Sequence, residues 1–296
     1  MFKQIVRSLS TITLPNSSTN YIHPFTLTGL NRLTKLGTHG FVSLVDVMPS
    51  LIPEGSTGDY AIVQAARVSY GDGTKKVNDD ENLLRYLWRQ QHTSPFEMCS
   101  VKFHVKTPIF VERQWVRHRT ATINEISGRY SILRDEFYRP TRVGYQSTNN
   151  KQGTSIESVP TNVSNNYYEM LDMTNDIYKK YLELIEQGVS REVARIALPV
   201  SIYTEFYWKA NLLNTLKFLR LRMDPHAQFE IREYANAMYE MLKPIFPYTM
   251  KAFEDYTLNT VTLSKLEIEA LKSGNDSNIK NKREREEFNN KLKKIR

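Results

Sequence analysis

A switch between two hydrophobic periodicities near residue 108 constrains the fold most. Apolar and polar residues alternate strictly over residues 101–105, which is typical of a strand that buries one face. Pro108 suits the first turn of a helix, and Phe110, Val111 and Trp115 then fall on one helical side. A strand that runs directly into an amphipathic helix predicts a domain in which both kinds of element share one core.

Strand and helix patterns alternate in the same way through most of the chain. Two more strands are predicted at residues 41–48 and 202–208. Helices are predicted at residues 60–70, 81–91, 163–187, 191–198, from 211 onward and from 224 onward. Gly188 is the expected end of the longest helix, and the polar residues 141–166 predict a loop or an insertion. We find no internal repeat, so the simplest organisation is one α+β domain over residues 37–262.

Both ends differ in composition from this middle region. Residues 1–36 are rich in Ser, Thr and Asn and contain no acidic residue, and their first apolar residues fall on one helical face. This composition is typical of a mitochondrial transit peptide and equally of a disordered extension, so mitochondrial and cytoplasmic locations both stay open. Residues 263–296 form a charged tail with little to bury, which we expect to be solvated or partly helical.

The formal net charge of +8 is concentrated at these ends. Residues 1–45 have four basic and no acidic residues, and residues 280–296 have eight basic and three acidic ones, which leaves residues 46–279 close to neutral. Arginines in the middle region are therefore better explained by one anion-binding pocket than by a nucleic-acid surface. No apolar run is long enough to span a membrane, and the single cysteine, Cys99, excludes an intramolecular disulfide. We expect neither nucleic acid nor a membrane as a partner.

A cluster of arginines lies in residues 117–131, RHRTATINEISGRYS. Guanidinium groups stay charged at physiological pH and bind phosphate through two parallel hydrogen bonds, so these arginines are candidates for a phosphate or pyrophosphate site. Ser127 and Gly128 would let backbone amides approach the same anion. Taken alone, RHR also fits the end of a helix whose basic side chains complement the helix dipole.

The wider pattern resembles that of the flavin-dependent thymidylate synthases. Their signature is RHR, seven residues and a serine, which residues 117–127 match, and residues 128–131 continue it as GRYS. The resemblance covers residues 38–255 and leaves both ends outside. Five further segments carry it: AARVS (65–69), HTSPFE (92–97), PIFVERQW (108–115), REVAR (191–195) and LRMDPHAQ (221–228).

The resemblance implies a fold, an assembly and a reaction. Members of the family have a central, mostly antiparallel sheet flanked by helices, and they form homotetramers whose active sites combine residues from several subunits. They convert dUMP to dTMP by reductive methylation, in which methylenetetrahydrofolate donates the carbon, reduced FAD donates a hydride and NADPH reduces the flavin again. A catalytically inactive relative that binds flavin or nucleotide for structural reasons is the alternative.

Residue by residue, the resemblance implies two sets of binding residues. The set around dUMP comprises Gln114, Arg117, Glu125, Ser127, Gly128, Arg129, Arg195 and Arg222. The set around the flavin and its meeting point with folate comprises His92, Ser94, Arg117, His118, Arg119, Glu125 and Asn211. Uracil must become electrophilic without a covalent enzyme nucleophile, so a fixed cation beside its imide should stabilise the developing negative charge. Arg222 is the predicted catalytic residue.

One position departs from the family pattern. Many relatives have Asn-Ala-Arg where this chain has Asn211, Leu212 and Leu213, so an arginine that contacts the flavin is missing. Lys217 lies one helical turn further along and would restore a positive charge near the cofactor phosphates. We therefore include Lys217 among the predicted cofactor-binding residues.

Other chemistries fit the sequence less well. Cys99 invites comparison with thymidylate synthases that attack uracil through cysteine, but no adjacent base would activate it, and a buried structural thiol is favoured. Ser127 has no histidine spaced to act as its base and is interpreted as a hydroxyl that positions substrate. A metal hydrolase would need a ligand motif such as HExxH, which the chain lacks, so no metal is expected.

Overall fold

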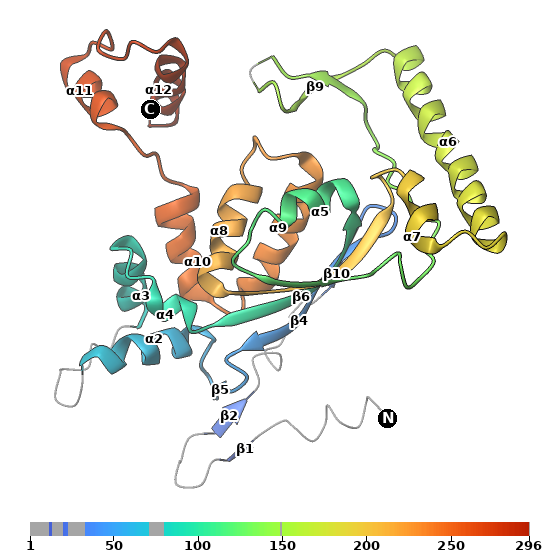
Figure 1. Ribbon diagram of the computed structural model, residues 1–296. Coiled ribbons are helices and arrows are strands. Elements are labelled where there is room, and N and C mark those ends of the chain that lie inside the picture. Colours follow the sequence, from blue (N-terminus) through green and yellow to red (C-terminus); the bar gives the residue numbers. More distant parts are fainter. Residues whose placement is uncertain (1–11, 14–19, 23–32, 71–79, 149, 296) are drawn as a thin grey trace. The chain divides into compact units, whose positions relative to one another are not determined.

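The computed structural model describes residues 12–13, 20–22, 33–70, 80–148 and 150–295 (Figure 1). The chain divides into two compact units, Met1–Met250 and Lys251–Arg296. All of the predicted site residues belong to the first unit. Among the described residues, none of the helices is both long and apolar enough to cross a membrane.

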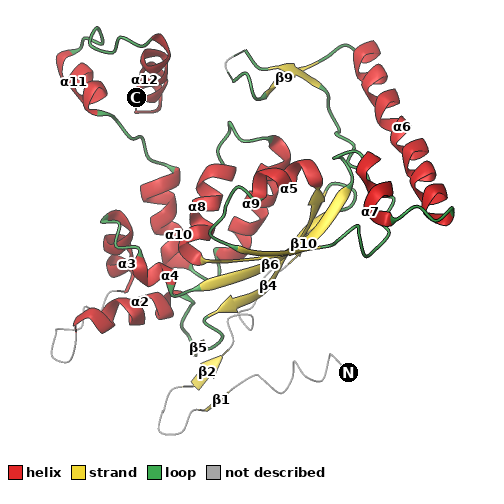
Figure 2. Cartoon of the chain, viewed as in Figure 1, coloured by secondary structure: helices red, strands yellow, loops and turns green. Residues whose placement is uncertain are grey.

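A five-stranded antiparallel sheet forms the centre of the first unit, with the strand order β3-β4-β6-β10-β7 (Figure 2). This arrangement confirms the expected antiparallel sheet in an α+β fold. The five strands are β3 (Leu33–Leu36), β4 (Gly40–Met48), β6 (Ser100–Pro108), β7 (Thr122–Glu125) and β10 (Tyr203–Asn211). Two smaller sheets contain β1 (Ile12–Thr13), β2 (Asn20–Ile22) and β5 (Ile52–Pro53), and β8 (Gly144–Gln146) with β9 (Thr154–Ser158).

Helices connect these strands and pack beside them. In the first unit they are α2 (Asp59–Arg67), α3 (Asp80–Arg89), α4 (Ser94–Glu97), α5 (Ile109–Trp115), α6 (Thr161–Glu186), α7 (Arg191–Ala194), α8 (Leu212–Arg222) and α9 (Phe229–Leu242), with 3-10 turns at Val68–Tyr70 and Arg195–Ala197. α10 (Pro247–Phe253) begins at the end of this unit.

The core lies on one face of the central sheet, where α5, α8 and α9 pack against it (Figure 1). The strict alternation over residues 101–105 predicted a strand with one buried face, and the three apolar side chains of this segment are all buried. Trp115 of α5 is fully buried, and its ring centre lies 4.7 Å from that of Phe218 on α8 and 5.9 Å from that of Tyr234 on α9. The switch from strand to helix near residue 108 thus brings α5 back onto the sheet that it leaves.

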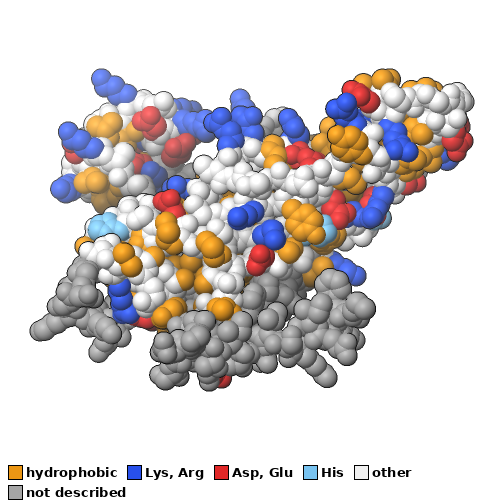
Figure 3. Space-filling view, turned by 60° about the horizontal axis from the view of Figure 1, so that its bottom comes forward, with side chains coloured by type: hydrophobic (Ala, Val, Ile, Leu, Met, Phe, Trp, Pro, Cys, Tyr) orange, Lys and Arg blue, Asp and Glu red, His pale blue; other side chains and the backbone are white. Residues whose placement is uncertain are grey.

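The opposite face of the same sheet is more open. His104 of β6 stacks on Tyr207 of β10 with ring centres 4.5 Å apart, and its Nε2 lies 2.7 Å from Oε1 of Glu205. Tyr207 is 45% exposed. Figure 3 turns the bottom of the view in Figure 1 forward, and its coloured surface shows hydrophobic side chains next to basic and acidic ones.

Most of the predicted elements are confirmed with small shifts of their ends. The longest helix was expected at residues 163–187 and spans Thr161–Glu186, and Gly188 follows it with a φ of 92°, which suits glycine. The polar segment 141–166 is not only a loop, because it contains the hairpin of β8 and β9 and the first turn of α6. The Gly, Asn and Ser residues of this segment interrupt the hydrophobic pattern, so the sequence did not predict the short hairpin.

One predicted helix start is wrong. The last long helix of the core was expected to begin at Asp224, but α9 begins at Phe229. The side chain of Asp224 accepts a hydrogen bond from the backbone N–H of His226 at 2.8 Å, and its carbonyl accepts from Ala227 N at 2.9 Å. An aspartate that bonds the backbone two residues later closes a turn, and this turn displaces the helix start.

A buried carboxylate joins two distant segments of the first unit. Asp59 of α2 accepts hydrogen bonds from the backbone N–H groups of Tyr248 at 2.8 Å and Thr249 at 3.1 Å and from the Thr249 hydroxyl, so it caps the first turn of α10. Burial raises the pKa of Asp59 to about 6, although these hydrogen bonds act in the opposite direction.

Replacing Asp59 by alanine is expected to lower the free energy of unfolding by about 2–4 kcal/mol, because it leaves buried donors without an acceptor. Urea unfolding of the purified variant measures this change. Asp176→Ala is the matched control, since this exposed aspartate on α6 only pairs with Lys179 at 3.3 Å, and we expect a change within about 0.5 kcal/mol. Equal stability of the two variants would contradict the capping role of Asp59.

The compact units meet after Met250, and the domain limits of residues 37 and 262 stay a prediction. β3 pairs with β4, so the central sheet already includes residues before 37. The second unit contains a π-helical turn (Glu254–Leu258), α11 (Lys265–Ser273) and α12 (Lys282–Ile295). Its residues 263–296 have more to bury than expected, because Ala270, Ile279 and Phe288 form a small apolar core.

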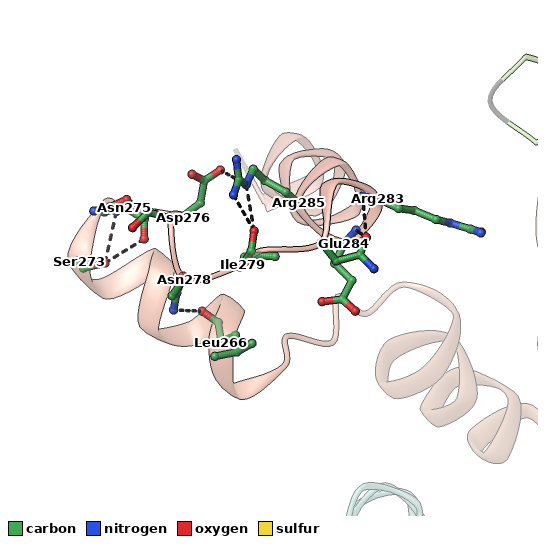
Figure 4. Close-up of polar contacts among 11 residues, drawn as sticks. Leu266, Ser273, Asn275, Asp276, Asn278, Ile279, Arg283, Glu284 and Arg285 are labelled. Atoms are coloured by element: carbon green, nitrogen blue, oxygen red, sulfur yellow. Dashed lines mark hydrogen bonds and ion pairs between the residues drawn. The ribbon is translucent and has the colours of Figure 1, made fainter.

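Polar contacts fix the turn between α11 and α12 within this second unit (Figure 4). α11 begins with a capping box in which Ser264 and Glu267 exchange hydrogen bonds. The guanidinium group of Arg285 donates to the carbonyl oxygen of Ile279 at 2.7 and 3.1 Å, and Asn278 donates to that of Leu266 at 3.3 Å. The charged tail is therefore a folded helical pair.

Candidate active site

The ends of α5 and α8 bring three predicted site residues into direct contact. Arg222 is the last residue of α8, Gln114 lies in α5, and His118 follows α5. Arg222 Nε donates to His118 Nε2 at 3.0 Å, and Arg222 Nη2 donates to the carbonyl oxygen of Gln114 at 2.8 Å. We call these three residues the Arg222 cluster.

Both hydrogen-bond partners of Arg222 in this cluster are neutral acceptors. Burial, and to a lesser extent the charge of Arg222, lowers the pKa of His118 to about 4, so its imidazole is neutral at physiological pH and its Nε2 accepts the hydrogen bond. Burial also lowers the pKa of Arg222 from its ordinary value. Neutral acceptors orient the guanidinium group without cancelling its charge, so that charge remains available to a ligand.

A second group of predicted residues lies in the loop after β7. Ser127 Oγ accepts a hydrogen bond from the backbone N–H of Arg129 at 3.3 Å. Gly128 is buried, and a Cβ at this position would lie 3.0 Å from Cδ of Arg195. A side chain at this position would require the Arg195 side chain to shift by a few tenths of an ångström, so Gly128 and Arg195 are closely packed. We call Ser127, Gly128, Arg129 and Arg195 the loop cluster.

The charges around the loop cluster are partly paired. The exposed side chain of Arg129 forms an ion pair with Glu192 at 3.1 Å, and Arg191 donates to the carbonyl oxygen of Tyr130 at 2.6 Å. An exposed ion pair of this kind is weak and is readily exchanged for a phosphate contact. Glu125, at the end of β7, is bound to the hydroxyl of Thr204, which fixes one of its two carboxylate oxygens.

The residues predicted to face the flavin are less closely connected. Asn211 is the N-cap of α8, and its side chain accepts from the backbone N–H of Asn214 at 2.9 Å. His92 is exposed with its ring 5.8 Å from that of Tyr86, and Ser94 is the first residue of α4. The further predicted cations on this side, Arg117, Arg119 and Lys217, are exposed.

The contacts include residues that the sequence interpretation did not select. Gln228 accepts a hydrogen bond from the side-chain amide of Gln114 at 2.5 Å, and it is the N-cap residue of α9. Glu192 and Thr204 hold Arg129 and Glu125 respectively. Gln228 and Glu192 lie in segments 221–228 and 191–195, which carry the family resemblance, so the sequence around them could have indicated a place in the site. Thr204 lies in a strand pattern, and no feature of the sequence around it indicated a role in the site.

The structure disfavours the cysteine mechanism. Cys99 is fully buried, and burial, with a smaller effect from the charge of Asp59, raises the pKa of its thiol to about 12. The reactive thiolate is therefore scarce at physiological pH. Among the described residues, no group of histidine, cysteine, aspartate and glutamate side chains is placed to hold a metal ion.

The antiparallel sheet and the helices on one of its faces define a mixed α+β protein, and the arginines of the Arg222 cluster and the loop cluster suit it to anionic ligands. The family model for "Thymidylate synthase complementing protein" matches residues 50–248. The chain belongs to this family, whose curated members among its relatives are named flavin-dependent thymidylate synthases.

Two relatives and one solved structure illustrate the similarity. The flavin-dependent thymidylate synthase of Dictyostelium discoideum is 54% identical over 261 residues, which are 88% of this chain and 86% of that protein. The enzyme of the same name from Treponema denticola is 50% identical over 270 residues, or 89% and 98% of the two chains. The crystal structure of the UMP/dUMP methylase PolB from Streptomyces cacaoi with 5-Br UMP superposes with a TM-score of 0.63 at 32% identity, over 75% of this chain and 97% of PolB.

Proposed function

We propose that this chain converts dUMP to dTMP by reductive methylation. The observation that carries the proposal is the Arg222 guanidinium group, which two neutral acceptors hold in place. The names of the relatives and the nucleotide bound to PolB agree with a pyrimidine nucleotide as substrate. The carbon donor is methylenetetrahydrofolate, and the alternative of an inactive relative has no observation in its favour.

Arg222 stabilises the transition state. Uracil must accept electron density during the reaction, and the ring delocalises this density as negative charge onto its oxygens and its imide nitrogen. A guanidinium group fixed in advance beside these atoms stabilises that charge without reorganising during the reaction. Gln114, in the same cluster, orients the pyrimidine. In the loop cluster, Arg129 binds the phosphate and Arg195 faces the uracil or the sugar.

The chain carries residues that fit FAD. The exposed guanidinium groups of Arg117 and Arg119 suit its pyrophosphate, and the exposed His92 suits the edge of its ring system. When bound, reduced FAD supplies the hydride, and NADPH is the reductant that regenerates it. The protein contributes binding, orientation and exclusion of water from the pocket.

A complete site combines two copies of the chain in a homotetramer. Among the described residues, no hydrogen bond or ion pair joins the Arg222 cluster to the loop cluster. β7, which leads into the loop cluster, is the edge strand of the sheet, and all four of its residues are exposed. We therefore assign the dUMP pocket to the Arg222 cluster of one subunit and the loop cluster of another.

The purified protein is expected to bind FAD and to show a flavin spectrum that bleaches with NADPH and recovers in air. Addition of dUMP and methylenetetrahydrofolate to the reduced protein should then yield dTMP, which chromatography measures. A protein that gains no FAD on titration would contradict the proposal. One that binds FAD but makes no dTMP would be an inactive relative.

Replacing Lys217 by alanine is expected to weaken FAD binding about tenfold, the effect of one charge-assisted contact to a phosphate. Lys217 is the first cation of α8 and is exposed, whereas Leu213, one turn earlier, is buried. Titration of FAD into the apoprotein measures the change. Lys180→Ala on α6, where Lys180 pairs with Glu183 at 2.7 Å, is the control. If FAD affinity is unchanged in Lys217→Ala, Lys217 does not replace the missing arginine.

A further inference from the structure

A cavity of about 680 Å3 lies between the β8–β9 hairpin and the turn that precedes α9. This volume is in the range of pockets that bind small molecules. None of the residues that line it belongs to the two predicted binding sets. The cavity is therefore separate from the clusters described above, although one of its walls touches the Arg222 cluster.

Specific contacts hold the walls of the cavity together. Asn150 of the hairpin donates its side-chain amide to the carbonyl oxygen of His226 at 3.3 Å, which fastens the hairpin to the turn. At the base of the hairpin, Arg142 Nη1 donates to the carbonyl oxygens of Ser155 at 2.7 Å and Ile156 at 3.0 Å. The hairpin thus closes the cavity in a defined geometry.

The lining carries an excess of positive charge. Arg142 and Arg232 both line the cavity. The Nη1 atom of each donates to a carbonyl oxygen, and for Arg232 this is the carbonyl oxygen of Pro225 at 3.1 Å. Carbonyl oxygens fix a guanidinium group but leave its charge uncompensated. The one carboxylate of the lining, Glu230, accepts a hydrogen bond from the hydroxyl of Tyr138 at 2.9 Å. Because two arginines and one carboxylate line the cavity, its charge favours the binding of an anion.

Gln228 connects this cavity to the Arg222 cluster. It lines the cavity, and its Oε1 accepts the hydrogen bond from the side chain of Gln114 at 2.5 Å. The carbonyl oxygen of Gln114 in turn holds Arg222. Gln228 therefore places one wall of the cavity directly beside the Arg222 cluster.

We propose that the cavity binds the anionic end of a co-substrate, a group that carries two or more carboxylates or phosphates. The inference rests on the proposed function, which needs two molecules of this kind. A reduced folate ends in glutamate carboxylates, and NADPH carries a phosphate on its adenosine ribose. Both ends are remote from the reacting atoms, so their binding energy adds affinity and orientation without taking part in the chemistry.

Calorimetric titration with two probes tests the cavity without relying on catalysis. γ-Linked triglutamate represents the folate end, and 2′,5′-ADP represents the phosphate end of NADPH. We expect one of the two to bind the wild-type protein, and Arg232→Gln to weaken its binding about tenfold, the effect of one charge-assisted contact. Arg232→Lys keeps the charge and should retain most of the affinity, which separates loss of charge from misfolding.

Arg139→Gln is the matched control, because Arg139 lies in the same segment but lines another cavity and pairs with Asp172. Binding to this variant should equal that of wild type. In the active enzyme, Arg232→Gln should raise the KM of only the co-substrate whose probe bound, and leave the KM for dUMP unchanged. If neither probe binds, or if Arg232→Gln binds as wild type does, the inference is overturned. If a probe binds but no dTMP forms, the proposed function fails and the binding site stands.

Discussion

Replacing Arg222 by alanine is expected to lower kcat for dUMP methylation by about a hundredfold to a thousandfold, the usual effect of removing one preorganised group that stabilises charge in the transition state. His118 and Gln114 hold the guanidinium group through neutral acceptors, so its charge stays available for the proposed contact with uracil. Single-turnover formation of dTMP on the flavin-reduced enzyme measures the loss, because it separates this reaction from reduction of the flavin.

Two further variants define the role of Arg222. Arg222→Lys keeps the charge but cannot donate to His118 and Gln114 in the same geometry, so we expect only partial recovery. Arg220→Ala removes an exposed arginine of the same helix and should retain turnover. If Arg222→Ala loses FAD binding to the same extent as turnover, its role is structural and the charge-stabilising mechanism is wrong.

The neutral state of His118 allows its imidazole to lie in contact with Arg222 within a motif of three consecutive basic residues. A protonated imidazole could not accept the hydrogen bond from Arg222 Nε, and two neighbouring cations would repel each other. Burial lowers the pKa of His118 to about 4 and so prevents this repulsion at physiological pH. The middle residue of the RHR motif thus orients Arg222, in addition to the flavin contact that the resemblance implies for it.

The sequence predicts the fold well where periodicity is strong. The alternation over residues 101–105 and the apolar side of α5 each predict an element with one buried face, and those faces are buried in the structure. Boundaries that depend on side-chain hydrogen bonds are less predictable, as the turn made by Asp224 before α9 demonstrates. The hairpin of β8 and β9 was hidden for a related reason, because it is short and both of its strands are largely exposed.

The sequence proposes the candidate site as a set of residues but does not specify how they are arranged. The signature over residues 117–131 identifies the arginines, yet it does not indicate that Arg222 bonds His118 across 104 positions of sequence. It also gives no sign that the loop cluster and the Arg222 cluster are separate groups within one chain. Contacts between segments that are distant in sequence depend on how the helices pack, which local patterns do not specify.

Mixing two inactive variants is expected to restore activity if each site combines two subunits. Arg222→Ala disables the Arg222 cluster, and Arg129→Ala disables the loop cluster at an exposed position. When the two variants share tetramers at random, roughly a quarter of the sites receive both intact clusters, so roughly a quarter of the wild-type activity should return. The measurement is dTMP formation after subunit exchange, with each variant alone as the baseline.

A second mixture controls for nonspecific stabilisation. Arg222→Ala mixed with Gln114→Ala places both defects in the Arg222 cluster, so each site still contains one defective copy of that cluster and activity should stay at the baseline. Recovery in the first mixture but not in the second requires the two clusters to come from different chains. If neither mixture recovers activity although subunits exchange, each chain contains a complete site. The segment after β7 must then move to bring the loop cluster to Arg222 within the same subunit.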